Sequence, residues 1–235
     1  MFVIEEKVWD SDFFGFITGE LRFLSDLGEF PFALNKAKQD NYRLLYWKIP
    51  AEEIDTNQFA ESEKIFLGDT KIVFEIPRLE IPPQKINLVK KWTIPANESL
   101  IHLGIYSGKY SRFKNDPLLP EGSFEKMYRE WVLQSLNGNM GDDIYYIGDV
   151  NDPLAMITLS IKSQFAEIGL IAVKQEYQQQ GFGKLLVEFA AYITFENKLN
   201  RLIVATQLSN LPAIKLYEKC GGEIIKQENI YHIWL

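Results

Sequence analysis

An apolar stretch, FAEIGLIAV (165–173), leads into the loop EYQQQGFGKLL (176–186), and the loop leads into a helix with one apolar side. Two glycines, Gly181 and Gly183, stand one residue apart where this helix begins. Successive backbone N–H groups at a helix N-terminus form a concave positive site that suits an anion such as a pyrophosphate. Glycine lets the backbone approach such an anion closely. This strand–loop–helix segment therefore predicts an α/β fold that binds an anionic ligand.

The elements predicted along the rest of the chain make a mixed β-sheet flanked by helices. Strands are expected at 13–23, 42–48, 71–75, 85–92, 142–150, 153–162, 165–173 and 201–207, with a final stretch at 223–235. Helices are expected near 31–39, 97–110, 123–138, 183–196 and 211–219, with Asn97 and Ser123 as N-caps and Gly138 as a stop.

The segment EIPRLEIPPQKI (75–86) contains three prolines, which interrupt any regular element. We therefore predict a domain boundary at this point. Residues 1–83 are expected to form a smaller α/β domain, and residues 84–235 a larger domain that contains the glycine loop.

Composition excludes several classes of function. The net charge of −7 argues against a broad electrostatic contact with nucleic acid or an anionic membrane. A single cysteine, Cys220, leaves no intrachain disulfide, and only two histidines, His102 and His232, argue against a clustered metal site. The sequence has no apolar run of membrane-spanning length and does not begin like a signal peptide. We therefore expect a cytoplasmic protein without a metal.

Two familiar nucleotide-binding motifs do not fit the glycine loop. The dinucleotide pattern G-x-G-x-x-G requires a third glycine where this chain has Leu186. The Walker pattern requires Ser or Thr after Gly183-Lys184, and Leu185 stands there. From the residues alone, a simple tight turn into a helix remains open beside an anion site.

The segment VKQEYQQQGFGKLL (173–186) resembles the acyl-CoA loop of the GNAT acetyltransferase superfamily, [QR]-x-x-G-x-[GA], with Gln178, Gly181 and Gly183 in the motif positions. The segment VATQLSNLPAIKLYEKCGGE (204–223) resembles the second GNAT block, N-x-x-A-x-x-x-Y, with Asn210 and Tyr217. The resemblance implies a GNAT fold with acyl-CoA as co-substrate. The residues it assigns to acyl-CoA are Ile171, Val173, Gln178, Gln179, Gly181, Phe182, Gly183, Lys184 and Asn210.

The same resemblance implies a mechanism of direct acyl transfer to an amine. A backbone N–H near Val173 is expected to polarise the thioester carbonyl. Tyr217 is expected to protonate the departing thiolate, since a phenol of pKa about 10 is protonated at neutral pH. The base that deprotonates the amine stays open among Asp69, Glu75, His102, His232 and a chain of water molecules. The residues alone also allow Asn210 to be a helix cap and Tyr217 to be a core aromatic.

The stretches WDSDFFGF (9–16), GDTKIVFE (68–75) and GKYSRFKNDPLLPEGSFEKMYREWVLQSLNG (108–138) look like those of sugar N-acyltransferases of the dTDP-fucosamine acetyltransferase type. This likeness implies a dTDP-linked 4-amino- or 3-amino-dideoxyhexose as acceptor, used in surface polysaccharide such as lipopolysaccharide O-antigen. It also implies that the N-terminal domain contributes to the sugar site.

Phe14, Arg112 and Phe113 are the expected substrate contacts. A guanidinium suits bidentate phosphate recognition, and aromatic rings can stack on a base. The alternative from the residues is that Arg112 forms a surface ion pair with Asp116 and that Phe113 is a core residue. A protein or peptide amine remains the alternative acceptor, and a non-catalytic acyl-CoA-binding module the alternative class. A homodimer is left open.

Overall fold

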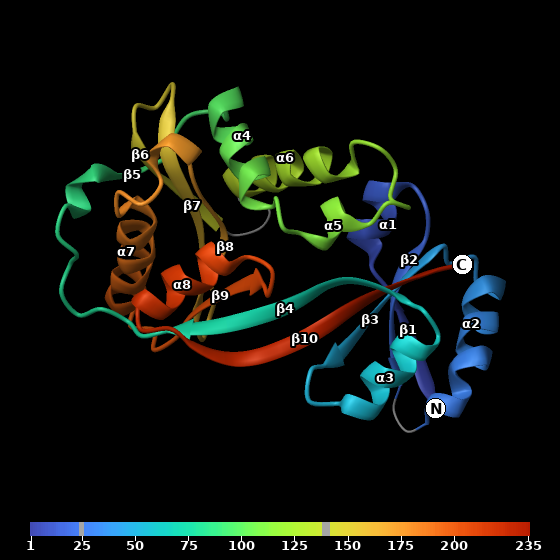
Figure 1. The fold of residues 1–235 in the computed structure, drawn as a ribbon. Coiled ribbons are helices and arrows are strands. Elements are labelled where there is room, and N and C mark those ends of the chain that lie inside the picture. Colours follow the sequence, from blue (N-terminus) through green and yellow to red (C-terminus); the bar gives the residue numbers. More distant parts are fainter. Residues whose placement is uncertain (24–25, 138–141) are drawn as a thin grey trace. The chain divides into compact units, whose positions relative to one another are not determined.

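The computed structural model describes residues 1–23, 26–137 and 142–235, which divide into two compact units (Figure 1). Unit 1 comprises Met1–Lys71, Ser111–Ser123 and Lys226–Leu235, and unit 2 comprises Ile72–Tyr110 and Phe124–Ile225. The predicted boundary after residue 83 stays a prediction; unit 1 includes two segments from beyond it. Gly138, the predicted helix stop, lies outside the described residues.

Unit 1 is an α/β unit built around strands in the order β1-β2-β3-β10-β4. Strands β1 and β2 are antiparallel, β2 and β3 are parallel, and β3 and β10 are antiparallel. Its core contains Leu21, Phe30, Trp47 and Tyr231, all of them buried. The elements are β1 (Phe2–Glu6), α1 (Val8–Phe14), β2 (Thr18–Phe23), a 3-10 turn (Leu27–Glu29), α2 (Phe30–Gln39), β3 (Leu44–Pro50), α3 (Ile54–Ser62), α5 (Arg112–Asn115) and parts of β4 (Phe66–Ile76) and β10 (Glu223–Trp234).

Unit 2 has strands in the order β4-β9-β8-β7-β6-β5. Strands β5 to β8 pair antiparallel, whereas β8 and β9 are parallel. Helix α7 packs Leu186 and Ala190 into a core with Ile157 and Val204. The elements are a 3-10 turn (Ile86–Leu88), β5 (Val89–Lys91), α4 (Glu98–Ser107), α6 (Ser123–Leu136), β6 (Asp142–Gly148), β7 (Pro153–Ile161), β8 (Ala166–Val173), a 3-10 turn (Gln175–Tyr177), α7 (Phe182–Glu196), β9 (Leu202–Gln207) and α8 (Leu211–Lys219).

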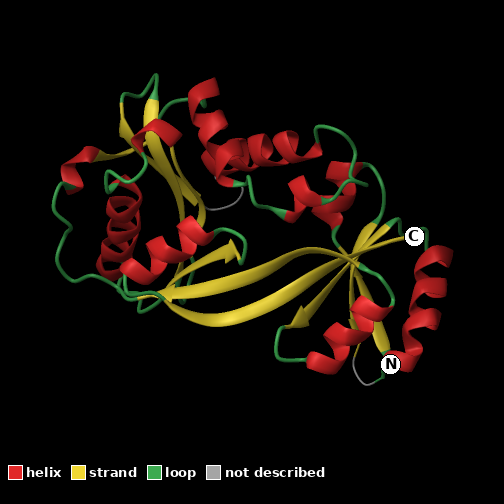
Figure 2. Cartoon of the chain, in the orientation of Figure 1, coloured by secondary structure: helices red, strands yellow, loops and turns green. Residues whose placement is uncertain are grey.

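The mixed α/β fold predicted from the sequence is confirmed, and helix α8 matches its predicted bounds residue for residue. Asn97 caps α4 by accepting a hydrogen bond from the N–H of Leu100. The helices and strands can be followed by colour in Figure 2, where β4 and β10 are the two longest strands. Both of these strands have residues in each unit. In the described ranges no helix is both long and apolar enough to cross a bilayer.

Two predicted strands are partly wrong. Residues 13–17 do not belong to a strand, because α1 continues to Phe14 and ends at Gly15 in the left-handed conformation (φ 75°). The strand itself begins at Thr18. Ile86–Leu88 form a 3-10 turn that leaves only Val89–Lys91 as a strand, since Lys85 has φ 64°. Strand β1 and helices α1, α3 and α5 were not expected from the sequence.

Candidate active site

Strand β8 separates from its parallel neighbour before it ends. Its pairing with β9 covers Ala166–Ile168, whereas its pairing with β7 continues to Val173. The register with β7 shifts between Ile157 and Leu159, so an irregularity lies where the two neighbours of β8 diverge. In the described part of the chain, the edge of Ile171 and Val173 that faces away from β7 therefore carries no ladder. Such an edge accepts an added extended chain, which is the role expected for the pantetheine arm.

The loop after β8 is tied to the unit by Gln178. The Nε2 amide of Gln178 donates to the carbonyl oxygen of Val173 (3.2 Å) and to the hydroxyl of Tyr106 on α4 (3.1 Å). The side chain thus fixes the loop to the end of β8 and to a helix. Gln178 acts here as a positioning residue, and its expected contact with acyl-CoA stays a prediction.

The two glycines of the loop have different structural roles. Gly181 is the N-cap of α7 and has φ 89°, and Gln179 two residues earlier has φ 61°. A Cβ at Gly181 would meet no heavy atom within 4 Å, so the backbone conformation and not the space requires glycine. At Gly183 a Cβ would lie 3.2 Å from Cδ2 of Leu216, so this glycine permits close packing of α7 on α8.

The first turn of α7 provides the N–H groups on which the expected phosphate site depends. Gly181 offers no side-chain cap, and the first intrahelical bond runs from the N–H of Leu185 to the carbonyl of Gly181. The N–H groups of Phe182, Gly183 and Lys184 precede this bond, as is general at helix N-termini. Together with the helix dipole, they favour an anion at this point.

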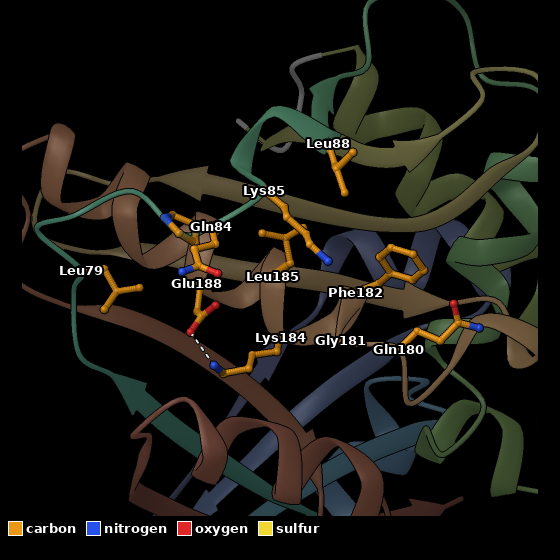
Figure 3. A pocket seen from close by; sticks show the side chains of 11 residues that line it. Leu79, Gln84, Lys85, Leu88, Gln180, Gly181, Phe182, Lys184, Leu185 and Glu188 are labelled. Atoms are coloured by element: carbon orange, nitrogen blue, oxygen red, sulfur yellow. Dashed lines mark ion pairs between the residues drawn. The ribbon is translucent and has the colours of Figure 1, made fainter.

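A pocket of about 410 Å³ lies beside this helix terminus, between the segment 79–88 and the first two turns of α7 (Figure 3). Gln180, Gly181, Phe182 and Lys184 contribute to its wall, as does Lys85. Lys184 pairs with Glu188 across one helical turn (3.0 Å), and this carboxylate raises the pKa of the Lys184 ammonium. Lysines and exposed helix N–H groups thus share one cavity, which suits a phosphate-bearing ligand.

Helix α8 carries the residues of the second motif. Asn210 is the N-cap of α8: its Oδ1 accepts from the N–H of Ala213 (3.4 Å) and its Nδ2 donates to Thr206 (3.1 Å). Tyr217 is 2% exposed, and its ring centroid lies 5.4 Å from that of Phe74. Burial raises the pKa of the Tyr217 hydroxyl above its ordinary value, so the group is protonated at neutral pH. The cap and the core aromatic are therefore both present, and the roles in acyl-CoA binding and proton donation stay predictions.

The three expected substrate contacts come together in unit 1. The guanidinium of Arg112 lies 4.1 Å from the ring centroid of Phe113 and 4.8 Å from that of Tyr46. The Phe14 and Phe113 rings are 6.3 Å apart. Phe14 and Phe113 are half-buried and pack against a small apolar core, so the core role that the residues alone allowed for Phe113 is present. The ion pair of Arg112 with Asp116 is not among those found in the described ranges. Asp116 is instead hydrogen-bonded to His232 and accepts a hydrogen bond from the indole N–H of Trp234 (3.0 Å).

The four candidate bases are divided between the units. Asp69 and His232 lie around Arg112 in unit 1: a Cβ built at the adjoining Gly68 would be 3.1 Å from both Arg112 Cβ and His232 Nε2. Glu75 pairs with Arg201 in unit 2 (2.9 Å), and His102 is exposed on α4. The sequence did not indicate Tyr46, because it lies in an apolar strand and has the pattern of a core residue.

In the described ranges, no group of three or more His, Cys, Asp or Glu side chains is arranged to hold a metal ion. The described residues of the site offer backbone N–H groups, phenol and imidazole side chains and carboxylates.

Comparisons with known proteins agree with this geometry. Residues 110–222 match the Acetyltransferase (GNAT) family. The spore coat polysaccharide biosynthesis protein SpsD of Bacillus subtilis is 23% identical over 205 residues, which cover 84% of this chain and 68% of that protein. N-alpha-acetyltransferase 30 of Xenopus laevis is 29% identical over 68 residues, 29% of this chain and 24% of that one. A GCN5-related N-acetyltransferase of Sphaerobacter thermophilus has a similar fold, with a TM-score of 0.63 at 10% identity, covering 93% of this chain and 72% of that structure. Residues 110–222 thus match a GNAT acetyltransferase domain, and this match together with the fold supports an acyl-CoA-dependent N-acyltransferase.

Proposed function

We propose that this enzyme transfers an acetyl or another short acyl group from acyl-CoA to the amino group of a dTDP-linked 4-amino- or 3-amino-dideoxyhexose. The product would enter surface polysaccharide, such as the O-antigen of lipopolysaccharide, and the reaction would take place in the cytoplasm. The observation that carries the proposal is the meeting of Phe14, Arg112 and Phe113 in unit 1. Similarity to SpsD over 84% of this chain, a protein named for polysaccharide biosynthesis, supports it.

In this proposal unit 2 performs the acyl transfer. The free edge at Ile171 and Val173 holds the pantetheine arm, and the first turn of α7 holds the pyrophosphate. The neutral amine attacks the thioester carbonyl, and a backbone N–H near Val173 stabilises the oxyanion. The tetrahedral intermediate collapses by breaking its C–S bond, and Tyr217 donates its proton to the leaving thiolate. The nitrogen, positively charged after the attack, loses its proton to a base in the tetrahedral intermediate, so that the collapse gives a neutral amide.

The aromatic surface of unit 1 supports a planar or ring-shaped acceptor. Trp9 and Phe13 stack at 5.2 Å with an interplanar angle of 8°, and Phe14 stacks on Phe16 at 5.5 Å with an angle of 13°. Trp9 is 49% exposed on α1, a helix without a buried residue. The exposed ring of Trp9, backed by half-buried rings, suits a thymine base or the apolar face of a dideoxyhexose.

The competing acceptor is a protein or peptide N-terminus. It is favoured by the similarity to N-alpha-acetyltransferase 30, but that match covers only 29% of this chain. A peptide acceptor gives no account of the aromatic and charged groups assembled in unit 1.

The test is a steady-state assay with acetyl-CoA and three acceptors: a dTDP-linked 4-amino-4,6-dideoxyhexose, the corresponding free amino sugar and a peptide with a free N-terminus. We expect the nucleotide sugar to have the highest kcat/KM, because remote contacts position the reacting amine. Efficient acylation of the peptide with refusal of nucleotide sugars would reject the proposed acceptor and leave the acyl-CoA chemistry intact.

A further inference from the structure

Unit 1 contains a group of buried and half-buried polar side chains, two of which, Asp69 and His232, are among the candidate bases. We call Tyr46, Asp69, Arg112, Asp116 and His232 the polar cluster; they come from β3, β4, α5, the turn after α5 and β10. The Tyr46 and His232 rings lie 5.0 Å apart, and the Arg112 guanidinium stands over the Tyr46 ring. Burial raises the pKa of the Asp69 carboxyl, and the charge and the backbone of Arg112 act against that shift.

Four buried atoms of the polar cluster have no hydrogen-bond partner of normal geometry: Tyr46 Oη, Asp69 Oδ1, Arg112 Nε and His232 Nε2. Of these, Tyr46 Oη still interacts with the side chains of Arg112 and Asp10. Six such side-chain atoms occur in the described ranges, so most of them are concentrated at this one place. A buried polar group without a partner costs roughly 1–3 kcal/mol, and native proteins seldom tolerate several together. The concentration therefore points to a ligand that supplies the missing partners.

The tautomer of His232 is set by Asp116. The Nδ1 atom lies 2.6 Å from Asp116 Oδ2, and the other carboxylate oxygen accepts from the N–H of Leu118 (2.9 Å). Burial opposes ionisation of Asp116, but the hydrogen bonds from His232, Leu118 and Trp234 outweigh it and lower the pKa of the carboxyl. An ionised Asp116 accepts the Nδ1–H bond, which leaves the lone pair of a neutral imidazole on Nε2. His232 is 1% exposed, and burial lowers its pKa, so it is neutral at pH 7.

The charges around this lone pair favour a donor and oppose an anion. The carboxyl groups of Asp10, Asp69 and Asp116 all interact with Arg112 or His232, whereas Arg112 is the one cation in the cluster. Burial raises the pKa of Asp69, and Arg112 opposes that shift. Lys7 and Lys48, the cations that also act on Asp10, both form ion pairs with Glu20.

Glycine at position 68 allows the backbone of β4 to pack closely against His232 Nε2. The Cβ of any other residue would stand 3.1 Å from this nitrogen and 3.1 Å from Arg112 Cβ. Gly68 is not in the left-handed region, so space and not backbone strain accounts for the glycine. The carboxyl groups around this place make a hydrogen-bond donor a better partner for the cluster than a phosphate.

We propose that the polar cluster binds the amine-bearing carbon of the acceptor together with a neighbouring hydroxyl. The amine donates hydrogen bonds to His232 Nε2 and Asp69 Oδ1, and the hydroxyl accepts from the Arg112 Nε–H and the Tyr46 hydroxyl. This inference rests on the proposed function, because it specifies which part of an amino sugar unit 1 recognises. It distinguishes an amino sugar from a sugar whose nitrogen is already acylated, since an amide N–H is a poorer fit than an amine to two acceptors.

The experiment uses the fact that the chain has only two histidines. Imidazole ¹⁵N resonances of the full chain are assigned with His102→Gln, which alters an exposed residue of unit 2. The probes are the methyl glycoside of a 4-amino-4,6-dideoxyhexose, its N-acetyl derivative and the 4-hydroxy sugar. We expect the amine probe to shift the His232 Nε2 resonance and to leave His102 unchanged, while the N-acetyl probe shifts neither.

Two variants test the geometry directly. His232→Asn retains a side-chain N–H for Asp116 and removes the Nε2 acceptor, and Gly68→Ala places a methyl group beside Nε2. Each should weaken binding of the amine probe about tenfold or more, while His102→Gln binds as the unchanged protein does. Thermal unfolding of each variant checks that the fold is retained, and acetyl-CoA affinity should stay the same.

Absence of a His232 shift with the amine probe, or equal shifts with the amine and N-acetyl probes, would overturn the inference and leave a cluster satisfied by water. Equal affinity in His232→Asn would overturn it as well. The fate of the proposed function is separate: if the amine probe shifts His232 but no nucleotide sugar is acylated, the amine site stands and the dTDP-linked acceptor is wrong.

Discussion

The glycine loop of unit 2 and the polar cluster of unit 1 are built in opposite ways. The loop presents backbone N–H groups from one short segment, and the side chain of Gln178 only anchors it. The polar cluster presents side chains from segments up to 186 residues apart, Tyr46 and His232, and its backbone only carries them. A site made of backbone N–H groups selects a negatively charged ligand that can approach the backbone closely, which suits the phosphate that every acyl-CoA carries. A site made of side chains selects a ligand by its pattern of hydrogen-bond donors and acceptors, which suits discrimination between acyl-accepting substrates.

The largest effect is expected from a change that breaks the backbone site without altering its charge. Gly181→Val forces a β-branched residue into φ 89°, a conformation that costs about 1–2 kcal/mol for an ordinary residue and more for a branched one. The backbone will relax toward negative φ and turn the N–H groups at the start of α7 away. We expect acetyl-CoA affinity, measured by calorimetry, to fall by on the order of a hundredfold.

Gly122→Val is the matched control for this loss. Gly122 also has a positive φ, 75°, and its Cβ would also meet nothing within 4 Å, but it lies in unit 1. Both variants should lose similar stability in thermal unfolding. If Gly122→Val lost acetyl-CoA affinity to the same extent, general destabilisation and not the loop would explain the result.

The second effect concerns the proposed acid of unit 2. Tyr217→Phe retains the ring that packs on Phe74 and removes the hydroxyl. We expect kcat to fall about a hundredfold with acetyl-CoA affinity little changed, since general acid catalysis is typically worth 10²–10⁴-fold. Because burial raises the pKa of this hydroxyl, it stays protonated from pH 6 to 9, and the Tyr217 contribution should be constant across that range. Full turnover of the variant under conditions where chemistry limits the rate would identify Tyr217 as a packing residue only.

A smaller effect is expected from the side-chain site. His232→Asn should raise the acceptor KM about tenfold and leave the acetyl-CoA KM unchanged, which is the reverse of the result for Gly181→Val. The control is His102→Gln, which should change neither constant. An equal rise in both KM values would show that the substitution perturbs more than unit 1.

The pH dependence of stability gives a second test of His232→Asn. Burial lowers the pKa of His232 in the folded state below its unfolded value, so the unfolded chain binds a proton first as the pH falls. The stability associated with neutral His232 is thus fully present above about pH 6.5 and is lost progressively below it. Chemical denaturation between pH 7.5 and 5 should show this loss in the unchanged protein and a shallower one in His232→Asn. Identical slopes would contradict a buried neutral imidazole.

The two sites also differ in what the sequence could predict. Strand β8, the glycine loop, helix α7, strand β9 and helix α8 follow one another in the chain, so local signals suffice. These signals are an apolar strand, a glycine where φ is positive, and an amphipathic helix. The same signals do not predict helix α1, because none of its residues is buried and its aromatic side chains do not form one apolar face. Its end at Gly15 is the one local signal that marks it.

The polar cluster could be predicted only in pieces. The family resemblance predicts Arg112 as a substrate contact, and the sequence offers Asp69 and His232 only as two of four separate candidate bases. Nothing in the spacing of these residues brings them together, because their contact depends on the pairing of β10 with β3 across the whole length of the chain. Tyr46 and Asp116 carry no local signal, since one lies in an apolar strand and the other in a turn before a proline.

The smallest effect on acetyl-CoA affinity is expected from Lys184, whose charged side chain lies beside the backbone N–H groups of α7. Lys184 lines the pocket beside α7 but is paired with Glu188. Lys184 is exposed and Glu188 is half-buried, so solvent screening limits what the pair contributes. Lys184→Gln should weaken acetyl-CoA binding only about threefold, and Glu188→Gln, which frees the ammonium, should strengthen it by a similar factor. These two changes in acetyl-CoA affinity should decrease toward zero as the salt concentration is raised. The loss of affinity in Gly181→Val should persist, because salt does not screen a change in backbone geometry. A loss in Lys184→Gln as large as that in Gly181→Val would mean that this site depends on its side chains after all, and the contrast between the two units would fail.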